Sequence, residues 1–171
     1  MGKRERASLP EPYMRLTCKL FKALKDKLGD KLISLVVYGS VARGEAKRDS
    51  DLDLLIVARD LPKGRLKRQE LFEVVEKAVE EDIEKLRGRG YNVFLSPILK
   101  TPEEASKLSP LYLDMVEDAV ILYDKEEFFK GVLDRLRSKL EELGARKVRL
   151  GKKWYWILKE DYEFGEVIEI E

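Results

Sequence analysis

Apolar segments near the middle of the chain constrain the fold more than any other sequence feature. Leu32–Tyr38 and residues 51–58 are nearly continuous apolar runs, and residues 91–99 form a third. Strands that are apolar on both faces are typical of a sheet covered by helices on both sides. Amphipathic patterns over residues 12–28 and 65–87 predict such helices. The expected fold class is therefore α/β (an α+β mixed sheet), with a central mixed β-sheet flanked by helices.

The C-terminal part of the chain predicts shorter elements. Residues 101–104 form a capping box with proline at the first helical position, and Ser-Pro at 109–110 starts another helix that runs to about residue 118. Residues 120–123 predict a short strand. A second capping box at residues 124–127 opens a helix that ends near Gly144, and residues 147–158 predict a β-hairpin. No internal repeat or long linker divides the chain.

Composition excludes several kinds of catalysis. The chain has no histidine and one cysteine, Cys18. Ser-His-Asp and Cys-His catalysis, histidine-bound zinc and an intrachain disulfide are therefore excluded. Cys18 falls within the amphipathic pattern of residues 12–28, so we expect a buried thiol that packs as a small hydrophobe. The 34 basic and 33 acidic residues give a net charge of +1, which provides no overall field for a nucleic acid.

The sequence also carries expectations about location and source. It shows no apolar run long enough to cross a bilayer and no N-terminal signal pattern. We expect a soluble, cytoplasmic protein without membrane contact. Asparagine and glutamine occur once each, whereas lysine, arginine and glutamate are abundant. This composition is typical of thermophile proteins, in which ion-pair networks contribute more to stability at high temperature.

The segment between the first two apolar runs predicts an anion site. The run ends in Gly39-Ser40, and Arg43 follows closely. Gly39 lets an anion approach the backbone. A helix that starts there provides free N–H groups, and Ser40 adds a hydroxyl. The spacing of Gly39 and Gly44 is similar to that of a P-loop, but Glu45-Ala46 replaces the Lys-Ser/Thr of that motif. The segment is therefore not a P-loop.

Two aspartates follow the anion-site segment. Asp51 and Asp53 are two residues apart at the start of the second apolar run, so their carboxylates project from one side of a strand. A hard cation such as Mg²⁺ fits between them, with substrate phosphates completing its coordination. The alternative is that both are exposed residues on an edge strand. Aspartate is uncommon in strands, and the upstream Gly-Ser favours the functional interpretation.

These residues carry a family resemblance. Gly39-Ser40, Ala42-Arg43-Gly44 and residues 50–54, Ser-Asp-Leu-Asp-Leu, resemble the signature of the DNA-polymerase-β-like nucleotidyltransferases, and most closely the minimal nucleotidyltransferase domains. The resemblance covers roughly residues 12–100. It implies that Gly39, Ser40 and Arg43 hold the phosphates of ATP or another nucleoside triphosphate. It also implies that Asp51 and Asp53 bind Mg²⁺ (or Mn²⁺) during transfer of a nucleotidyl, most often adenylyl, group to a hydroxyl.

The resemblance is incomplete at one position. Catalytic members of the family usually carry a third carboxylate on the next strand, whereas residues 91–99 contain no acid. Asn92 and Ser96 are the polar residues there and are expected on one face, with Ser96 the candidate for the third position. Three acids from neighbouring helices are the other candidates for the third position: Glu103, Glu104 and Asp114. For each of them, a solvated position on the surface is the simpler interpretation.

The missing carboxylate leaves a second hypothesis open. Minimal nucleotidyltransferases are often paired with small helical HEPN-type proteins, so the chain could be an antitoxin-like binding module that restrains such a partner and adenylylates it weakly or not at all. We expect a nucleotidyltransferase core at residues 12–124, a C-terminal helix and hairpin at 125–160 packed on the same domain, and an acidic tail at 161–171.

The hairpin supports a third and weaker hypothesis. Residues 146–153 contain five basic residues and no acid, and they lead into Trp154-Tyr155-Trp156. Interleaved basic and aromatic residues suit single-stranded nucleic acid. Because Trp154, Trp156 and Leu158 share one strand face, packing of this face against the domain is the favoured interpretation.

Overall fold

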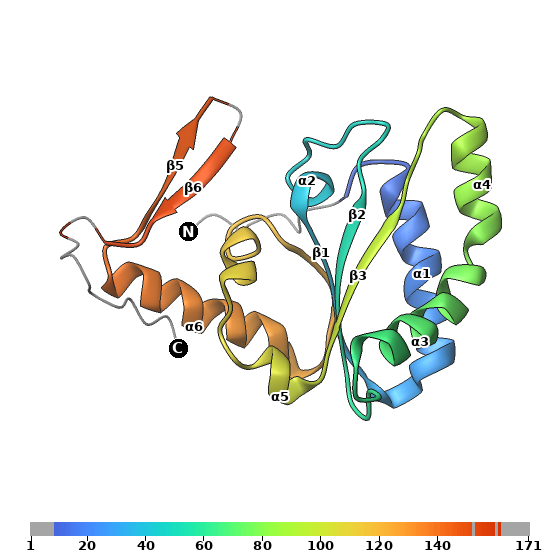
Figure 1. Cartoon of the computed structure of the whole chain (residues 1–171), viewed down its shortest axis with the longest axis horizontal. Helices are drawn as coiled ribbons and strands as arrows, with labels where there is room; N and C mark the ends of the chain where they lie inside the picture. Colours follow the sequence, from blue (N-terminus) through green and yellow to red (C-terminus); the bar gives the residue numbers. More distant parts are fainter. Residues whose placement is uncertain (1–8, 152, 160, 162–171) are drawn as a thin grey trace.

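The computed structural model describes residues 9–151, 153–159 and 161. Its helices and strands follow the chain from the N-terminal to the C-terminal end (Figure 1): α1 (Tyr13–Leu28), η1 (Gly29–Lys31), β1 (Leu32–Tyr38), α2 (Gly39–Ala42), β2 (Leu52–Ala58), α3 (Arg65–Lys77), α4 (Glu80–Gly88), β3 (Leu95–Lys100), α5 (Pro102–Ala105), η2 (Pro110–Asp114), β4 (Val120–Asp124), η3 (Lys125–Glu127), α6 (Phe128–Glu142), β5 (Arg146–Leu150) and β6 (Lys153–Ile157).

The central sheet is mixed, as expected from the sequence. Its strand order is β3-β2-β1-β4, with β1 antiparallel to both of its neighbours and β2 parallel to β3. Every residue of β1 is buried, because the strand has a neighbour on each side and helices over both faces. The two strands with the most continuous apolar sequence are thus the two interior strands.

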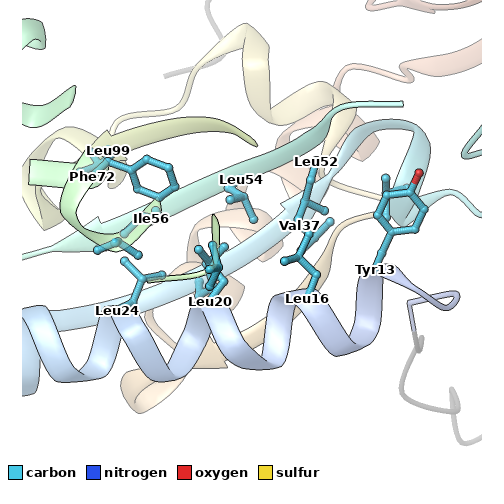
Figure 2. Close-up of a cluster of buried hydrophobic side chains, with 14 of the residues drawn as sticks. Tyr13, Leu16, Leu20, Leu24, Val37, Leu52, Leu54, Ile56, Phe72 and Leu99 are labelled. Carbon is cyan, nitrogen blue, oxygen red and sulfur yellow. The ribbon is translucent and has the colours of Figure 1, made fainter. Parts of the chain in front are cut away.

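Alternate residues of the strands form two hydrophobic cores. On one face, β1 and β2 pack against α1, α3 and α4, and Figure 2 shows Leu20 and Leu24 of α1 below Leu54 and Ile56 of β2. On the other face, the intervening strand residues pack against η2 and α6, with Phe129 completely buried. This alternation places Asp53 on the η2 side of the sheet, in the same row as Leu55 and Val57.

Several element boundaries differ from the prediction. The helix expected over residues 65–87 is divided into α3 and α4, because the N–H groups of Ala78 and Val79 bond three residues back and tighten the turn. The third strand begins at Leu95 rather than at residue 91. The element after Ser109 is a short 3-10 helix that ends at Asp114 instead of continuing to residue 118.

Two predictions about single residues are wrong. Cys18 is exposed, because it lies on the outer side of α1 while Thr17 takes the buried position beside it. The second capping box does not form as expected. Glu127 adopts a left-handed conformation, and the Asp124 carboxylate instead accepts hydrogen bonds from the N–H groups of Phe129 (2.9 Å) and Lys130 (2.9 Å). The first capping box, between Thr101 and Glu104, is confirmed.

The hairpin β5–β6 extends away from the sheet beyond the end of α6 (Figure 1). The indole N–H of Trp156 donates to the carbonyl of Leu113 (3.2 Å), and Lys147 pairs with Glu117 and Asp118. Packing of Trp156 against the body of the domain is therefore confirmed, whereas Trp154 remains 42% exposed. Of the expected acidic tail, residues 162–171 lie outside the described part of the chain. No helix among the described residues is long and apolar enough to cross a bilayer.

Candidate functional site

The turn between β1 and α2 forms the first part of the site. Gly39 has a φ of +75°, a conformation that residues with a side chain rarely adopt. From there α2 begins at once: the Arg43 N–H donates to the Gly39 carbonyl (3.1 Å) and the Glu45 N–H donates to the Ser40 carbonyl (2.9 Å). The N–H groups of the first helical turn have no partner within the helix and are available to an anion. Ser40 lies half-buried in this turn.

Asp53 lies directly against Gly39. Tyr38, the last residue of β1, is opposite Asp53 in the β1–β2 register. A Cβ atom on Gly39 would overlap the Oδ2 atom of Asp53, so only glycine leaves room for this carboxylate. The Gly-Ser turn and the second aspartate, fourteen positions apart by their numbers, are therefore brought into contact by the pairing of β1 and β2.

The charges around Asp53 are unbalanced. Its pKa is raised mainly by burial and then by the negative charges of Asp51 and Asp114, while a hydrogen bond from Ser96 and the positive charge of Arg43 oppose the shift. Burial also raises the pKa of Tyr38 to about 12, with smaller contributions from Asp53 and Asp114. The site therefore concentrates negative charge that a cation would stabilise.

The carboxylates fit a magnesium-type ion. Asp51 is exposed just before β2 and Asp53 is half-buried within it, and the negative charge of Asp51 acts on the Asp53 carboxylate. In the described part of the chain, no group of three histidine, cysteine or acidic side chains is arranged to hold a metal. Mg²⁺ is commonly held by one or two carboxylates with waters and substrate phosphates, so the pair satisfies this requirement. The edge-strand alternative is wrong for Asp53, because β2 lies between β1 and β3.

Ser96 occupies the position next to Asp53 on the third strand. The parallel register pairs Asp53 with Ser96, and the Ser96 hydroxyl hydrogen bonds to the carboxylate. Asn92 does not share a strand face with Ser96, because it precedes β3 and is exposed. A hydroxyl thus stands beside Asp53 at the position where the resemblance led us to look for a third carboxylate.

The other candidate acids differ in their positions. Glu104 is engaged by Arg68, which donates to both carboxylate oxygens (2.6 and 2.9 Å), and it also caps α5. Asp114 is exposed at the end of η2 and acts electrostatically on both Tyr38 and Asp53. Of these acids, Asp114 is the one whose charge reaches the site. Local sequence gives little signal for this, since the approach depends on the packing of η2 on the sheet.

Arg43 lies near the carboxylates and is held by a neighbour. Its Nε donates to Glu45 (3.1 Å), and its side chain is 26% exposed. Its effect on the pKa of Asp53 shows that the guanidinium acts on the site. The structure therefore brings together Gly39, Asp51, Asp53, Arg43 and Ser96 near one end of the sheet, with Ser40 in the adjoining turn.

The loop between α2 and β2 is supported from the opposite side of the sheet. The Tyr13 hydroxyl donates to the carbonyl of Lys47 (2.8 Å), and the Asn92 N–H donates to the carbonyl of Arg48 (2.7 Å). The Arg48 guanidinium lies over the Tyr91 ring, 5.6 Å from its centre. These contacts fix the loop that carries Asp51. The amphipathic pattern of α1 accounts for the burial of Tyr13 but gives no signal of this hydrogen bond.

Comparison with known proteins identifies the family. A family model described as "Nucleotidyltransferase domain" matches residues 17–130, two thirds of the chain. The chain belongs to the nucleotidyltransferase family. The resemblance drawn from the Gly-Ser and Asp-x-Asp segments is thereby confirmed, as is the expected enzyme class.

The chain is also similar to individual proteins. A protein of Methanocaldococcus jannaschii named "Putative protein adenylyltransferase MJ1305" is 35% identical over 132 residues, which cover 76% of this chain and 84% of the relative. Among solved structures, "Crystal structure of the toxin-antitoxin with AMP-PNP" is 21% identical with a TM-score of 0.46, covering 74% of this chain and 91% of that one. "Crystal structure the toxin-antitoxin MntA-HepT" is 17% identical with a TM-score of 0.44, covering 76% and 92%.

The hairpin lies outside the matched region. The family model ends at residue 130, within α6, whereas β5 begins at Arg146. All residues of the candidate site lie inside the match.

Proposed function

We propose that this nucleotidyltransferase transfers the adenylyl group of ATP to a hydroxyl group of a protein, with Mg²⁺ or Mn²⁺ bound by Asp51 and Asp53. The observation that carries the proposal is the contact of the Asp53 carboxylate with Gly39. It places a half-buried negative charge at the start of a turn whose backbone N–H groups can hold phosphates. The name of the relative that is 35% identical supports adenylyl transfer and a protein acceptor.

The chemistry is a substitution at phosphorus. The acceptor hydroxyl oxygen forms a bond to the α-phosphorus of ATP, the bond from that phosphorus to the β-phosphate bridging oxygen breaks, and pyrophosphate leaves. The hydroxyl proton passes to water. When bound, the divalent cation neutralises the phosphate charge and stabilises the attacking and leaving oxygens.

The residues of the chain position these groups. The Gly39–Ser40 turn holds phosphate oxygens, and Arg43 faces the charge that develops on the leaving pyrophosphate. Ser96 keeps the Asp53 carboxylate oriented through its hydrogen bond. Much of the rate enhancement then arises from positioning and from electrostatic stabilisation, as in other phosphoryl-type transfers.

Transfer of label from ATP to protein tests the proposal. ATP labelled at the α-phosphate should label hydroxyl-bearing side chains of a protein mixture, whereas ATP labelled at the γ-phosphate should not. Asp53→Asn should reduce the labelling at least about a hundredfold, consistent with loss of several kcal/mol of transition-state stabilisation. Asp49→Asn is the matched control, because Asp49 is an exposed aspartate in the same loop, and it should retain activity within twofold. Equal labelling from both positions of ATP would contradict adenylyl transfer.

A second candidate function follows from Ser96. With a hydroxyl beside Asp53 in place of a carboxylate, the alternative is an antitoxin-like module that restrains a small helical HEPN-type partner by contact. In that case the Asp53→Asn variant should still restrain the partner, because the substitution removes a metal ligand and leaves the contact surface intact. Loss of restraint in this variant would favour the enzymatic function.

A further inference from the structure

A cavity lies across the sheet from the candidate site, between α1 and α4. Its volume is about 410 Å³, within the usual range of about 300–1,000 Å³ for small-molecule sites. Pro12, Leu16, Leu86 and Tyr91 provide its apolar lining, and the first three of these are buried. Tyr91 is the partly exposed member of this lining, so its ring is the apolar surface that a small ligand in the cavity would contact.

Two arginines border this apolar lining. Arg15 of α1 and Arg89, which follows α4, both line the cavity. Within the described chain, neither guanidinium has a hydrogen-bond or ion-pair partner. A guanidinium presents several N–H donors in one plane and binds phosphate or carboxylate through paired hydrogen bonds. Unpaired arginines from two elements thus face the same cavity.

The remaining charged groups leave the cavity positive. Lys19 pairs with Asp82 and joins α1 to α4, so these two charges cancel. Lys85 lies 3.8 Å from Glu81 in an exposed pair, and Glu11 is the other acid at the border. Among the residues that line the cavity, four side chains are basic and two are acidic. The cavity should therefore attract anions.

We propose that this cavity binds a small phosphate-bearing molecule with a planar ring, of the nucleoside monophosphate class. Arg15 and Arg89 would hold the phosphate, and the ring would pack against the partly exposed ring of Tyr91. A planar ring suits the site because both tyrosine rings and guanidinium groups stack on flat surfaces. This site is separate from the nucleotide site at Gly39 and Asp53 and does not depend on adenylyl transfer.

The cavity is connected to the loop that carries Asp51. Tyr91 lines the cavity and also contacts Arg48, and the next residue, Asn92, donates its N–H to the Arg48 carbonyl. Tyr13, one residue after Pro12, holds the Lys47 carbonyl. A ligand that immobilises Tyr91 and the start of α1 thereby reduces the motion of residues 44–51. The ligand would act as an effector of the catalytic loop.

Calorimetric titration with AMP in EDTA tests this site, because the chelator removes any divalent cation from the aspartates. AMP should bind Asp53→Asn as tightly as the unmodified protein, within twofold. Arg15→Ala and Arg89→Ala should each weaken AMP binding at least tenfold. Both arginines are exposed, so neither substitution should unfold the chain. Arg59→Ala is the matched control, since Arg59 is an exposed arginine outside the cavity lining, and it should have no effect.

Three results would overturn the proposal. They are absence of AMP binding in EDTA, AMP binding that is unchanged by both arginine substitutions, and binding of inorganic phosphate as tight as that of AMP. Hydrogen exchange tests the connection to the loop: AMP should slow exchange of the amides of residues 44–51 in the unmodified protein and not in Arg89→Ala. Unchanged exchange in the presence of bound AMP would overturn the effector role.

Discussion

Asp53 destabilises the folded protein when it is ionised. Burial and the charges of Asp51 and Asp114 raise its pKa, so the folded state holds the proton more tightly than the unfolded state does. For a carboxyl group with a raised pKa, the unfavourable contribution is absent below the unfolded pKa and fully present above the folded pKa. The contribution of Asp53 to the free energy of unfolding therefore falls as pH rises from the unfolded pKa to the folded pKa.

We predict that Asp53→Asn raises the melting temperature at pH 7 in the absence of divalent cations. The neutral amide removes the buried charge and its repulsion with Asp51. The difference from the unmodified protein should shrink as pH falls and vanish below the unfolded pKa of an aspartate, about 3.9. Calorimetry across this range measures it, with Asp49→Asn as the control. A melting temperature that is lower in Asp53→Asn than in the unmodified protein at pH 7 would contradict this account.

Single residues of the site differ in how far the sequence predicts them. Gly39, Asp51 and Asp53 were predictable, because a Gly-Ser turn and an Asp-x-Asp strand are local patterns. Asp114 was one of three candidate acids, but the sequence did not distinguish it from the other two, and the hydrogen bond from Tyr13 to Lys47 had no signal at all. These interactions depend on how η2 and α1 pack on opposite faces of the sheet, which no local pattern specifies.

At the scale of elements, Asp124 connects β1, β4 and α6. Its Oδ1 accepts hydrogen bonds from the buried Ser34 hydroxyl (2.6 Å) and the Phe129 N–H, and its Oδ2 accepts one from the Lys130 N–H. Removing the carboxylate leaves a buried hydroxyl without this partner and uncaps α6.

We predict that Asp124→Ala lowers the free energy of unfolding by about 2–4 kcal/mol, from one buried unsatisfied group and one lost helix cap. Urea unfolding followed by circular dichroism measures the change. Glu126→Ala, an exposed acid two residues away, should change it by less than about 0.5 kcal/mol. Equal effects of the two substitutions would show that Asp124 does not hold these elements together.

Sequence patterns predicted the elements better than their ends. The helical pattern of residues 65–87 predicts one inward face. Four of its five members are buried and the fifth, Leu71, is partly buried, yet the helix is interrupted between α3 and α4: Val75, Val79, Ile83 and Leu86 are the buried four. The periodicity of the apolar residues indicates which side chains face the sheet. It does not indicate where a tightened turn interrupts the helix, because the buried face continues through that turn. The start of β3 depends likewise on its partner, since its pairing with β2 begins at Leu52 and Leu95.

At the scale of the whole molecule, the hairpin is peripheral to both hydrophobic cores. The buried members of the cores extend no further than Leu140, and the hairpin adds partly buried contacts from Trp156 and Leu158. The proposed division of the chain, with a core at residues 12–124 and the helix and hairpin packed on it, therefore predicts that the sheet forms without residues 146–171.

We predict that a chain ending at Ala145 folds cooperatively, with a melting temperature lower by about 5–15 °C. This range corresponds to a few kcal/mol for losing the packing of a partly buried tryptophan in a chain of this size. ATP binding should remain within threefold, because Gly39, Asp51 and Asp53 are supported by β1, β2 and α1. Scanning calorimetry and titration of ATP measure the two quantities, and Trp156→Ala in the full chain should reproduce most of the stability loss. If the shortened chain does not fold, the hairpin is an integral part of the domain, because its contacts with Leu113, Glu117 and Asp118 would then be required to hold η2 on the sheet.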